Sequence, residues 1–240
     1  GVNIGQGLPR AMSVSGVPVT SISDLEGYGV MNQIEKEQLR DKALHAFKDI
    51  YGQAIGTGVV SEYIGKTGLD VLKGADLLGD VASNYQSTVE YADNSIAKSL
   101  KDVARIHLNG LGTRIFYTNH GGYDTHANEM PTHPKLMSDL SGAISDFLDD
   151  LDQHDESENV AILVFTEFGR RMRDNGSGTD HGSGGGAFLF GKNVKGGLYS
   201  EYPSLAPSDW EHGEDLKHTI DFRGIYGTVL EQWLDLDAKP

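Results

Sequence analysis

Apolar residues recur with a period near 3.6 in five stretches of the chain, and this period predicts amphipathic helices. Asp93 or Asn94 is placed to cap the first turn of the third helix. In the fourth, Asp149 and Asp150 belong to a set of acids that we expect to face solvent. The predicted helices cover residues 31–55, 69–89, 95–108, 133–155 and 221–236.

Shorter apolar runs between the helices predict strands at 11–22, 114–119, 159–168 and 187–191. The run at 159–168 is apolar almost throughout, which is typical of a central parallel strand buried on both faces. Helices that alternate with strands favour a layered α/β fold. No repeat and no linker interrupts residues 1–240, so we expect a single domain.

Acidic and histidine side chains follow the ends of these predicted strands. Asp124 and His126, in NHGGYDTHANE, come after the strand at 114–119. Glu167 ends the strand at 159–168, and Asp180 and His181 lie in a glycine-rich loop before the next strand. Active sites of α/β sheets form beyond the carboxyl ends of their strands, so we expect these five side chains to converge.

Carboxylates and imidazoles without thiolates suit a divalent metal: Zn, Mn, Mg or Ca. The metal would offset the repulsion among clustered acids and polarise a phosphoryl or sulfuryl oxygen. Arg170 is a candidate clamp for an anionic substrate, and His120 a candidate contact to the substrate or the metal-binding residues.

Each of these features also has a simpler interpretation. Asp124 and Asp180 are ordinary turn residues in that view, and the glycine-rich loop is a flexible surface loop. Glu167 would then form an ion pair with Arg170 or Arg171. It is the combination of three such connections at equivalent strand ends that favours the metal site.

The amino-acid composition excludes or disfavours several classes of binding partner and of site. The chain has 20 basic and 35 acidic residues, a formal charge of −15, which disfavours nucleic acid and anionic membranes. No apolar stretch approaches the roughly 18 residues of a membrane span. Cysteine is absent, which excludes disulfides and thiolate ligands. A P-loop, a dinucleotide-binding glycine motif and a G-x-S-x-G elbow are also missing.

Four segments in order, GGYDTHAN, VFTEFGRRMRDNGSGTDHGSGGGAFLFG, VKGGLYSEYPSL and DFRGIYGTVLEQWL, resemble a bacterial family of uncharacterised proteins. That family is grouped with the alkaline phosphatase and sulfatase superfamily. The resemblance implies a three-layer α/β/α sandwich of the alkaline-phosphatase kind, with two divalent metals held by Asp and His. Phe168 stands where superfamily enzymes have a histidine ligand. We find no counterpart of their N-terminal nucleophile, so we expect the N-terminal part of the domain to be missing.

Two functions follow from the resemblance and the residues together. The first is a metal-dependent hydrolase of phosphate or sulfate esters, acting on small anionic substrates in the periplasm or outside the cell. The alternative is a non-catalytic exported binding protein that retains the fold. A third possibility is a structural calcium ion that holds the glycine-rich loop.

Overall fold

The computed structural model describes residues 1–13, 17, 19–23, 25, 28 and 34–239 as a mixed α/β chain with a small parallel sheet. Helix accounts for 43% of the chain and strand for 13%, which confirms the α/β class. The contacts divide the chain into two compact units: one combines 1–120 with 139–154, the other 121–138 with 155–240. Helix α4 (Glu129–Gln153) contributes to both units.

The first unit contains a three-stranded parallel sheet with β1 (Val2–Ile4) between β2 (Thr20–Ile22) and β3 (Phe116–Thr118). All three residues of β1 are buried, as expected of a central strand. The sequence did not predict β1, and the strand predicted at 11–22 is right only at its end. Residues Arg10–Met12 form a 3-10 helix, η1, whereas 14–16 and 18 lie outside the described residues.

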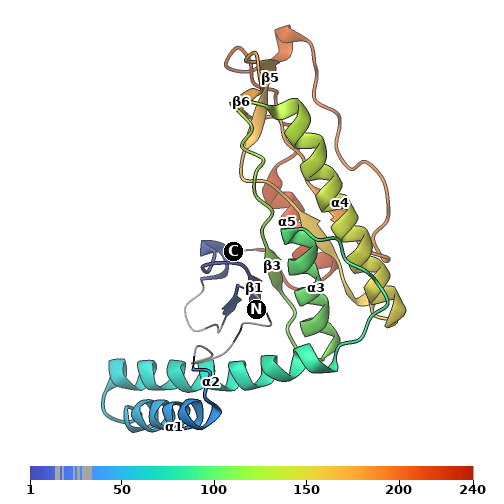
Figure 1. The fold of residues 1–240 in the computed structure, drawn as a ribbon. Helices are drawn as coiled ribbons and strands as arrows, with labels where there is room; N and C mark the ends of the chain where they lie inside the picture. Colours follow the sequence, from blue (N-terminus) through green and yellow to red (C-terminus); the bar gives the residue numbers. More distant parts are fainter. Residues whose placement is uncertain (14–16, 18, 24, 26–27, 29–33, 240) are drawn as a thin grey trace. The chain divides into compact units, whose positions relative to one another are not determined.

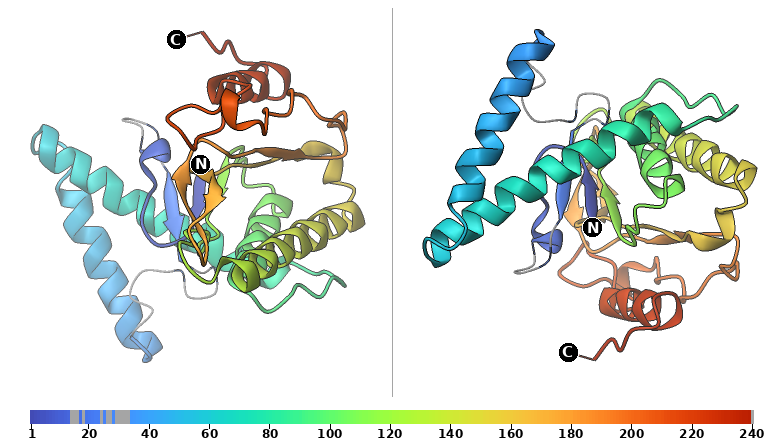
Figure 2. Two further views of the ribbon diagram at one scale, coloured as in Figure 1. Left: turned by 90° about the horizontal axis from the view of Figure 1, so that it is seen from above. Right: turned by 90° about the horizontal axis from the view of Figure 1, so that it is seen from below.

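Helices α1 (Glu37–Gln53) and α2 (Val59–Asn84) form a hairpin in the first unit (Figures 1 and 2). Two glycines of α2 allow the close approach, because a Cβ at Gly68 would lie 2.2 Å from the Tyr51 ring and one at Gly65 would lie 2.6 Å from the Tyr51 carbonyl oxygen. The helix predicted at 31–55 is confirmed only over α1, because the described residues 34–36 and 54–55 are not helical, and α2 begins ten residues before the predicted position.

Helix α3 (Ser95–Leu108) has the predicted bounds, and the Asn94 side chain caps it by accepting a hydrogen bond from the Ala97 N–H at 2.9 Å. Its apolar stripe and that of the C-terminal half of α4 are buried in the first unit. One prediction for α4 is wrong: Asp150 is 0% exposed, whereas Asp149 faces solvent. Asp150 is buried because Tyr85 and Tyr91 donate hydrogen bonds to its carboxylate.

The second unit contains two antiparallel pairs, the 3-10 helices η2 (Ser157–Asn159) and η3 (Pro207–Asp209), and helix α5 (Phe222–Gln232). Strand β4 (Ile162–Val164) pairs with β7 (Phe188–Phe190), and β5 (Gly169–Asp174) pairs with β6 (Thr179–Gly182). The prediction of a central parallel strand at 159–168, buried on both faces, is therefore wrong: β4 is antiparallel to β7 and its three residues are only partly buried. A parallel return needs a long crossover, usually a helix, whereas here the intervening chain folds into the β5–β6 hairpin.

Among the described residues, none of the helices is both long enough and apolar enough to span a membrane.

Candidate metal site

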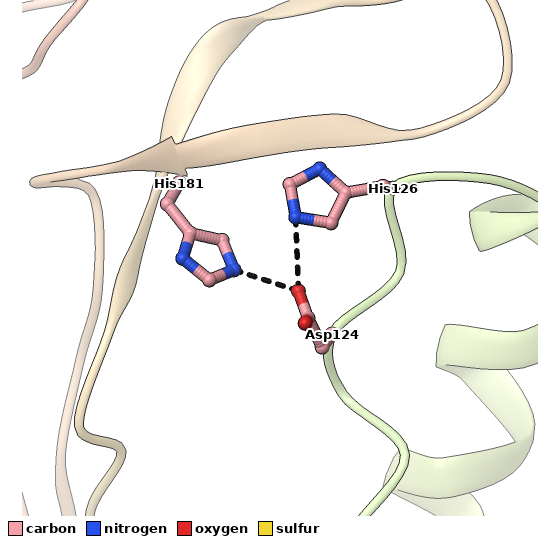
Figure 3. Close-up of side chains that lie close together, drawn as sticks. All are labelled: Asp124, His126 and His181. Carbon is pink, nitrogen blue, oxygen red and sulfur yellow. Dashed lines mark hydrogen bonds and ion pairs between the residues drawn. The ribbon is translucent and has the colours of Figure 1, made fainter.

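Asp124, His126 and His181 lie close together on the surface of the second unit (Figure 3). Asp124 and His126 belong to the irregular segment that precedes α4, and His181 is on β6. Their side chains remain about half exposed: 61% for Asp124, 48% for His126 and 47% for His181. Asp124 and His126, predicted to follow one strand, therefore do meet His181, which lies on β6 rather than in the predicted loop, and they meet where a ligand from solvent can reach them.

One oxygen of Asp124 is shared by both imidazoles. Its Oδ1 lies 2.6 Å from Nε2 of His181 and 3.1 Å from Nε2 of His126, as the dashed lines in Figure 3 show. One ligand atom from each of the three residues lies within 4.8 Å of the other two. Ligand atoms about 2 Å from a zinc ion are separated from one another by about 3 Å, so small adjustments would let these three bind one cation.

The charges in the cluster favour ionised carboxylates. The hydrogen bond from His181 is the main cause that lowers the pKa of Asp124, with smaller contributions from the charges of His126 and Arg170. The pKa of Asp180 is lowered first by the Asn175 side chain and then by His126. Both acids thus present negative oxygens at neutral pH, as a cation site needs.

Asp180 lies beside the cluster and contacts His126. Its Oδ1 is 3.1 Å from Nδ1 of His126, the ring nitrogen that faces away from Asp124. Asp180 is not one of the three residues whose ligand atoms converge. Glu167 does not belong to that group either, and it is exposed. Their predicted role as metal ligands stays a prediction.

Arg170 contacts both segments that carry the cluster. Its Nη1 donates to the Thr179 carbonyl oxygen and its Nη2 to the Tyr123 carbonyl oxygen, both at 2.5 Å. Nη2 also lies 3.6 Å from Oδ1 of Asp124. Arg170 therefore joins the β5–β6 hairpin to the segment that carries Asp124. The neighbouring Arg171 pairs instead with Glu214 and Asp215.

His120 belongs to the first unit, at the end of its segment 1–120, whereas the cluster belongs to the second unit. Its predicted contact to the substrate or the metal-binding residues stays a prediction.

An aromatic stack holds the His181 ring. The Phe168 ring lies parallel to it, with 4.4 Å between centroids and 8° between planes. The His126 ring stacks on His181 at 4.9 Å, and the Arg170 guanidinium lies 5.0 Å from the Phe168 centroid. Phe168 thus packs directly against one of the candidate ligands.

The sequence analysis missed the turn that brings the two segments together. Residues 175–178 connect β5 to β6, and Asn175 donates through Nδ2 to the His126 carbonyl oxygen at 3.0 Å. The Asn128 N–H donates to Ser177 Oγ at 2.9 Å, and the Glu129 N–H donates to the Ser177 carbonyl oxygen. The Asn175-Gly176 dipeptide was the available signal, since Asn-Gly is the strongest short-range indication of a hairpin.

Residues 62–233, well over half of the chain, match a protein family described as "Protein of unknown function (DUF1501)". The chain belongs to the DUF1501 family. All three clustered residues, and the turn that supports them, fall inside the matched range. No curated protein and no solved structure matches this DUF1501 chain.

Proposed function

We propose that this DUF1501 protein is a metal-dependent hydrolase of phosphate or sulfate esters, with a divalent cation bound by Asp124, His126 and His181. The observation that carries the proposal is the shared carboxylate oxygen, with Nε2 of both histidines within 3.1 Å of it. Two imidazoles and one carboxylate form the donor set of catalytic zinc sites that leave a position open for water or substrate.

The exposure of the three side chains supports a catalytic rather than a purely structural cation. Structural zinc sites are closed by four protein ligands, whereas this cluster offers three and is about half open to solvent. A cation there would polarise an ester's phosphoryl or sulfuryl oxygen. The Arg170 charge, 3.6 Å from Asp124, would add to the positive potential felt by an anionic substrate.

The family resemblance adds the finer part of the proposal: an α/β/α sandwich of the alkaline-phosphatase kind and a location in the periplasm or outside the cell. The small parallel sheet and the alternation of helices and strands are compatible with that architecture.

A non-catalytic binding protein is the second candidate, and one observation favours it. Both terminal nitrogens of Arg170 already donate to backbone carbonyl oxygens, which limits its use as a clamp for a reacting group. Such a protein would bind a cation and an anion at the cluster without turnover.

Elemental analysis of protein purified without chelator, together with calorimetric titration of Zn²⁺ and Mn²⁺, tests the cation. We expect one bound ion per chain, lost in His126→Ala and in His181→Ala but retained in the exposed control His218→Ala. A wild-type chain that binds neither ion would overturn the proposal.

Hydrolysis distinguishes the two candidates. p-Nitrophenyl phosphate and p-nitrophenyl sulfate are the probes, with this chain and with any longer natural polypeptide that contains it. Turnover abolished by the two histidine substitutions and by chelation supports the hydrolase. Cation binding without turnover in either polypeptide supports the binding protein.

A further inference from the structure

The two nitrogens of the His126 ring face two different carboxylates. Nε2 lies 3.1 Å from Asp124 Oδ1, on the side where the ligand atoms converge, and Nδ1 lies 3.1 Å from Asp180 Oδ1 on the opposite side. A histidine that binds a metal through one nitrogen commonly donates a hydrogen bond from the other to a carboxylate or a carbonyl oxygen. The arrangement around His126 is of that kind.

Resting on the proposed function, we infer that Asp180 is a positioning residue for His126 rather than a metal ligand. Asp180 accepts the hydrogen bond from Nδ1–H and so fixes the tautomer in which the Nε2 lone pair is free for the cation. The same hydrogen bond fixes the rotation of the ring, so that Nε2 points at Asp124. The adjacent residues Asp180 and His181 therefore have different roles: His181 binds the cation, and Asp180 orients His126.

Asn175 in turn holds Asp180. Its Nδ2 donates to Asp180 Oδ1 at 3.1 Å and to the His126 carbonyl oxygen at 3.0 Å. Its Oδ1 accepts from the Gly178 N–H at 2.9 Å and from the Ser177 N–H at 3.2 Å. The amide is therefore fixed at both ends by the hairpin turn. Asn175 links the backbone of one ligand to the carboxylate that orients it.

The two histidines of the site are thus oriented by different means. Asp180 orients His126 through a charge-assisted hydrogen bond, which acts on the tautomer as well as on the geometry. Phe168 holds the His181 ring by parallel stacking, which acts on geometry alone. Removing Asp180 should therefore weaken cation binding without changing the set of atoms that bind the cation.

Cobalt(II) tests this inference, because its visible absorption reports the ligand set and its titration reports affinity. In the full chain, Asp180→Ala should weaken Co²⁺ binding by about 10–100-fold, the usual effect of losing such an orienting partner. Asp180→Asn keeps a neutral acceptor and should recover part of the loss. At saturating Co²⁺ the absorption bands of both variants should match those of the wild type. Glu201→Gln, which removes an exposed acid elsewhere in the same unit, is the charge control.

Three results would overturn the inference. Saturated Asp180→Ala with absorption bands shifted from those of the wild type would make Asp180 a ligand. Affinity equal to that of Glu201→Gln would deny it any role. Nitrogen-15 NMR of the zinc-loaded wild type should show His126 protonated at Nδ1, and protonation at Nε2 would contradict the inference even if the variants fail to fold. If the wild type binds Co²⁺ but one of these three results is found, the inference about Asp180 fails and the proposed function stands. If the wild type does not bind Co²⁺, the inference and the proposed function both fail.

Discussion

Asp150 and Asp124 each contact side chains that carry rings. Asp150 is buried in the first unit, whereas Asp124 is exposed on the surface of the second unit. Asp150 is 0% exposed, and its Oδ2 accepts hydrogen bonds from the hydroxyls of Tyr85 and Tyr91 at 2.5 and 2.7 Å. Asp124 has a side chain 61% exposed and shares its Oδ1 between two imidazoles. The same residue type thus serves two purposes, according to its burial.

The buried cluster around Asp150 connects distant segments of the first unit. Tyr85 and Tyr91 come from the chain that follows α2, and Asp150 lies near the end of α4, so their hydrogen bonds join segments about sixty positions apart in sequence. His154 completes the cluster: its Nδ1 lies 2.7 Å from the Asp150 carbonyl oxygen and its Nε2 lies 2.9 Å from that of Gln86. No ligand from solvent can reach a carboxylate with no exposed surface.

The open cluster contributes little to stability by comparison. Ion pairs between exposed side chains stabilise proteins by at most about 1 kcal/mol. An arrangement of two histidines and an aspartate at the surface therefore adds little to stability, as the proposed role in ligand binding requires. The comparison predicts that substitutions in the two clusters will separate stability from cation affinity.

Asp150→Ala should have the largest effect on stability. It leaves two tyrosine hydroxyls without their hydrogen-bond acceptor and removes atoms from a packed interior. We expect the free energy of unfolding to fall by about 3 kcal/mol, as measured by urea denaturation. The adjacent Asp149→Ala is a matched control, since Asp149 is exposed, and should change it by less than about 0.5 kcal/mol. Equal effects of the two substitutions would mean that burial does not distinguish the clusters.

Gly178→Ala should reduce both stability and cation affinity. A Cβ at this position would lie 2.2 Å from the Thr125 carbonyl oxygen and 2.7 Å from the carbonyl carbon of His126, and backbone atoms cannot yield as a flexible side chain can. We expect a loss of about 2 kcal/mol in the free energy of unfolding. Gly186→Ala is the control, because no atom lies within 4 Å of its Cβ. Unchanged Zn²⁺ affinity in Gly178→Ala would show that the turn does not position the ligands.

Tyr85 makes the stability of the folded protein depend on pH in the alkaline range. Burial and the hydrogen bond to Asp150 raise the pKa of Tyr85 to about 12. The folded protein therefore favours the protonated hydroxyl, and this stabilisation is complete below about pH 10 and lost as the pH rises towards 12. Tyr85→Phe should cost about 1 kcal/mol at pH 7 and flatten the fall in stability above pH 10. The exposed Tyr63→Phe should do neither, and an unaltered alkaline profile in Tyr85→Phe would rule out this linkage.

Local signals predicted the regular helices. The expected convergence of five side chains came instead from the placement of strand ends, and the ligand atoms of only three of them, Asp124, His126 and His181, lie together. The period of α3 and its Asn94 cap act within a few residues, so the sequence was sufficient there. The burial of Asp150 was not predictable in this way. Its partners Tyr85 and Tyr91 lie far away in sequence, and nothing in the local pattern of α4 separates Asp150 from the exposed Asp149.

The strand pairing shows the same limit. An apolar run such as that of β4 indicates burial, but it does not indicate which strand will pair with it or in which direction. The glycine-rich sequence after β4 was interpreted as a loop because glycine weakens strand signals. In the structure, Gly169 and Gly182 are paired across the β5–β6 hairpin, where a Cβ at Gly169 would lie 2.7 Å from the Gly182 carbonyl oxygen. Close backbone approach, rather than flexibility, explains these glycines.

His181→Ala should have the smallest effect on stability and a large one on cation binding. The substitution removes one exposed partner of Asp124 and the stacking against Phe168, so we expect the free energy of unfolding to change by only about 0.5 kcal/mol. Loss of one of three protein ligands should abolish measurable Zn²⁺ binding in the same calorimetric titration that detects it in the wild type. Asp150→Ala should show the reverse pattern, with normal Zn²⁺ affinity in the folded fraction. A His181→Ala variant as unstable as Asp150→Ala would instead make the open cluster a structural one, because a site kept for a ligand can be emptied without unfolding the protein.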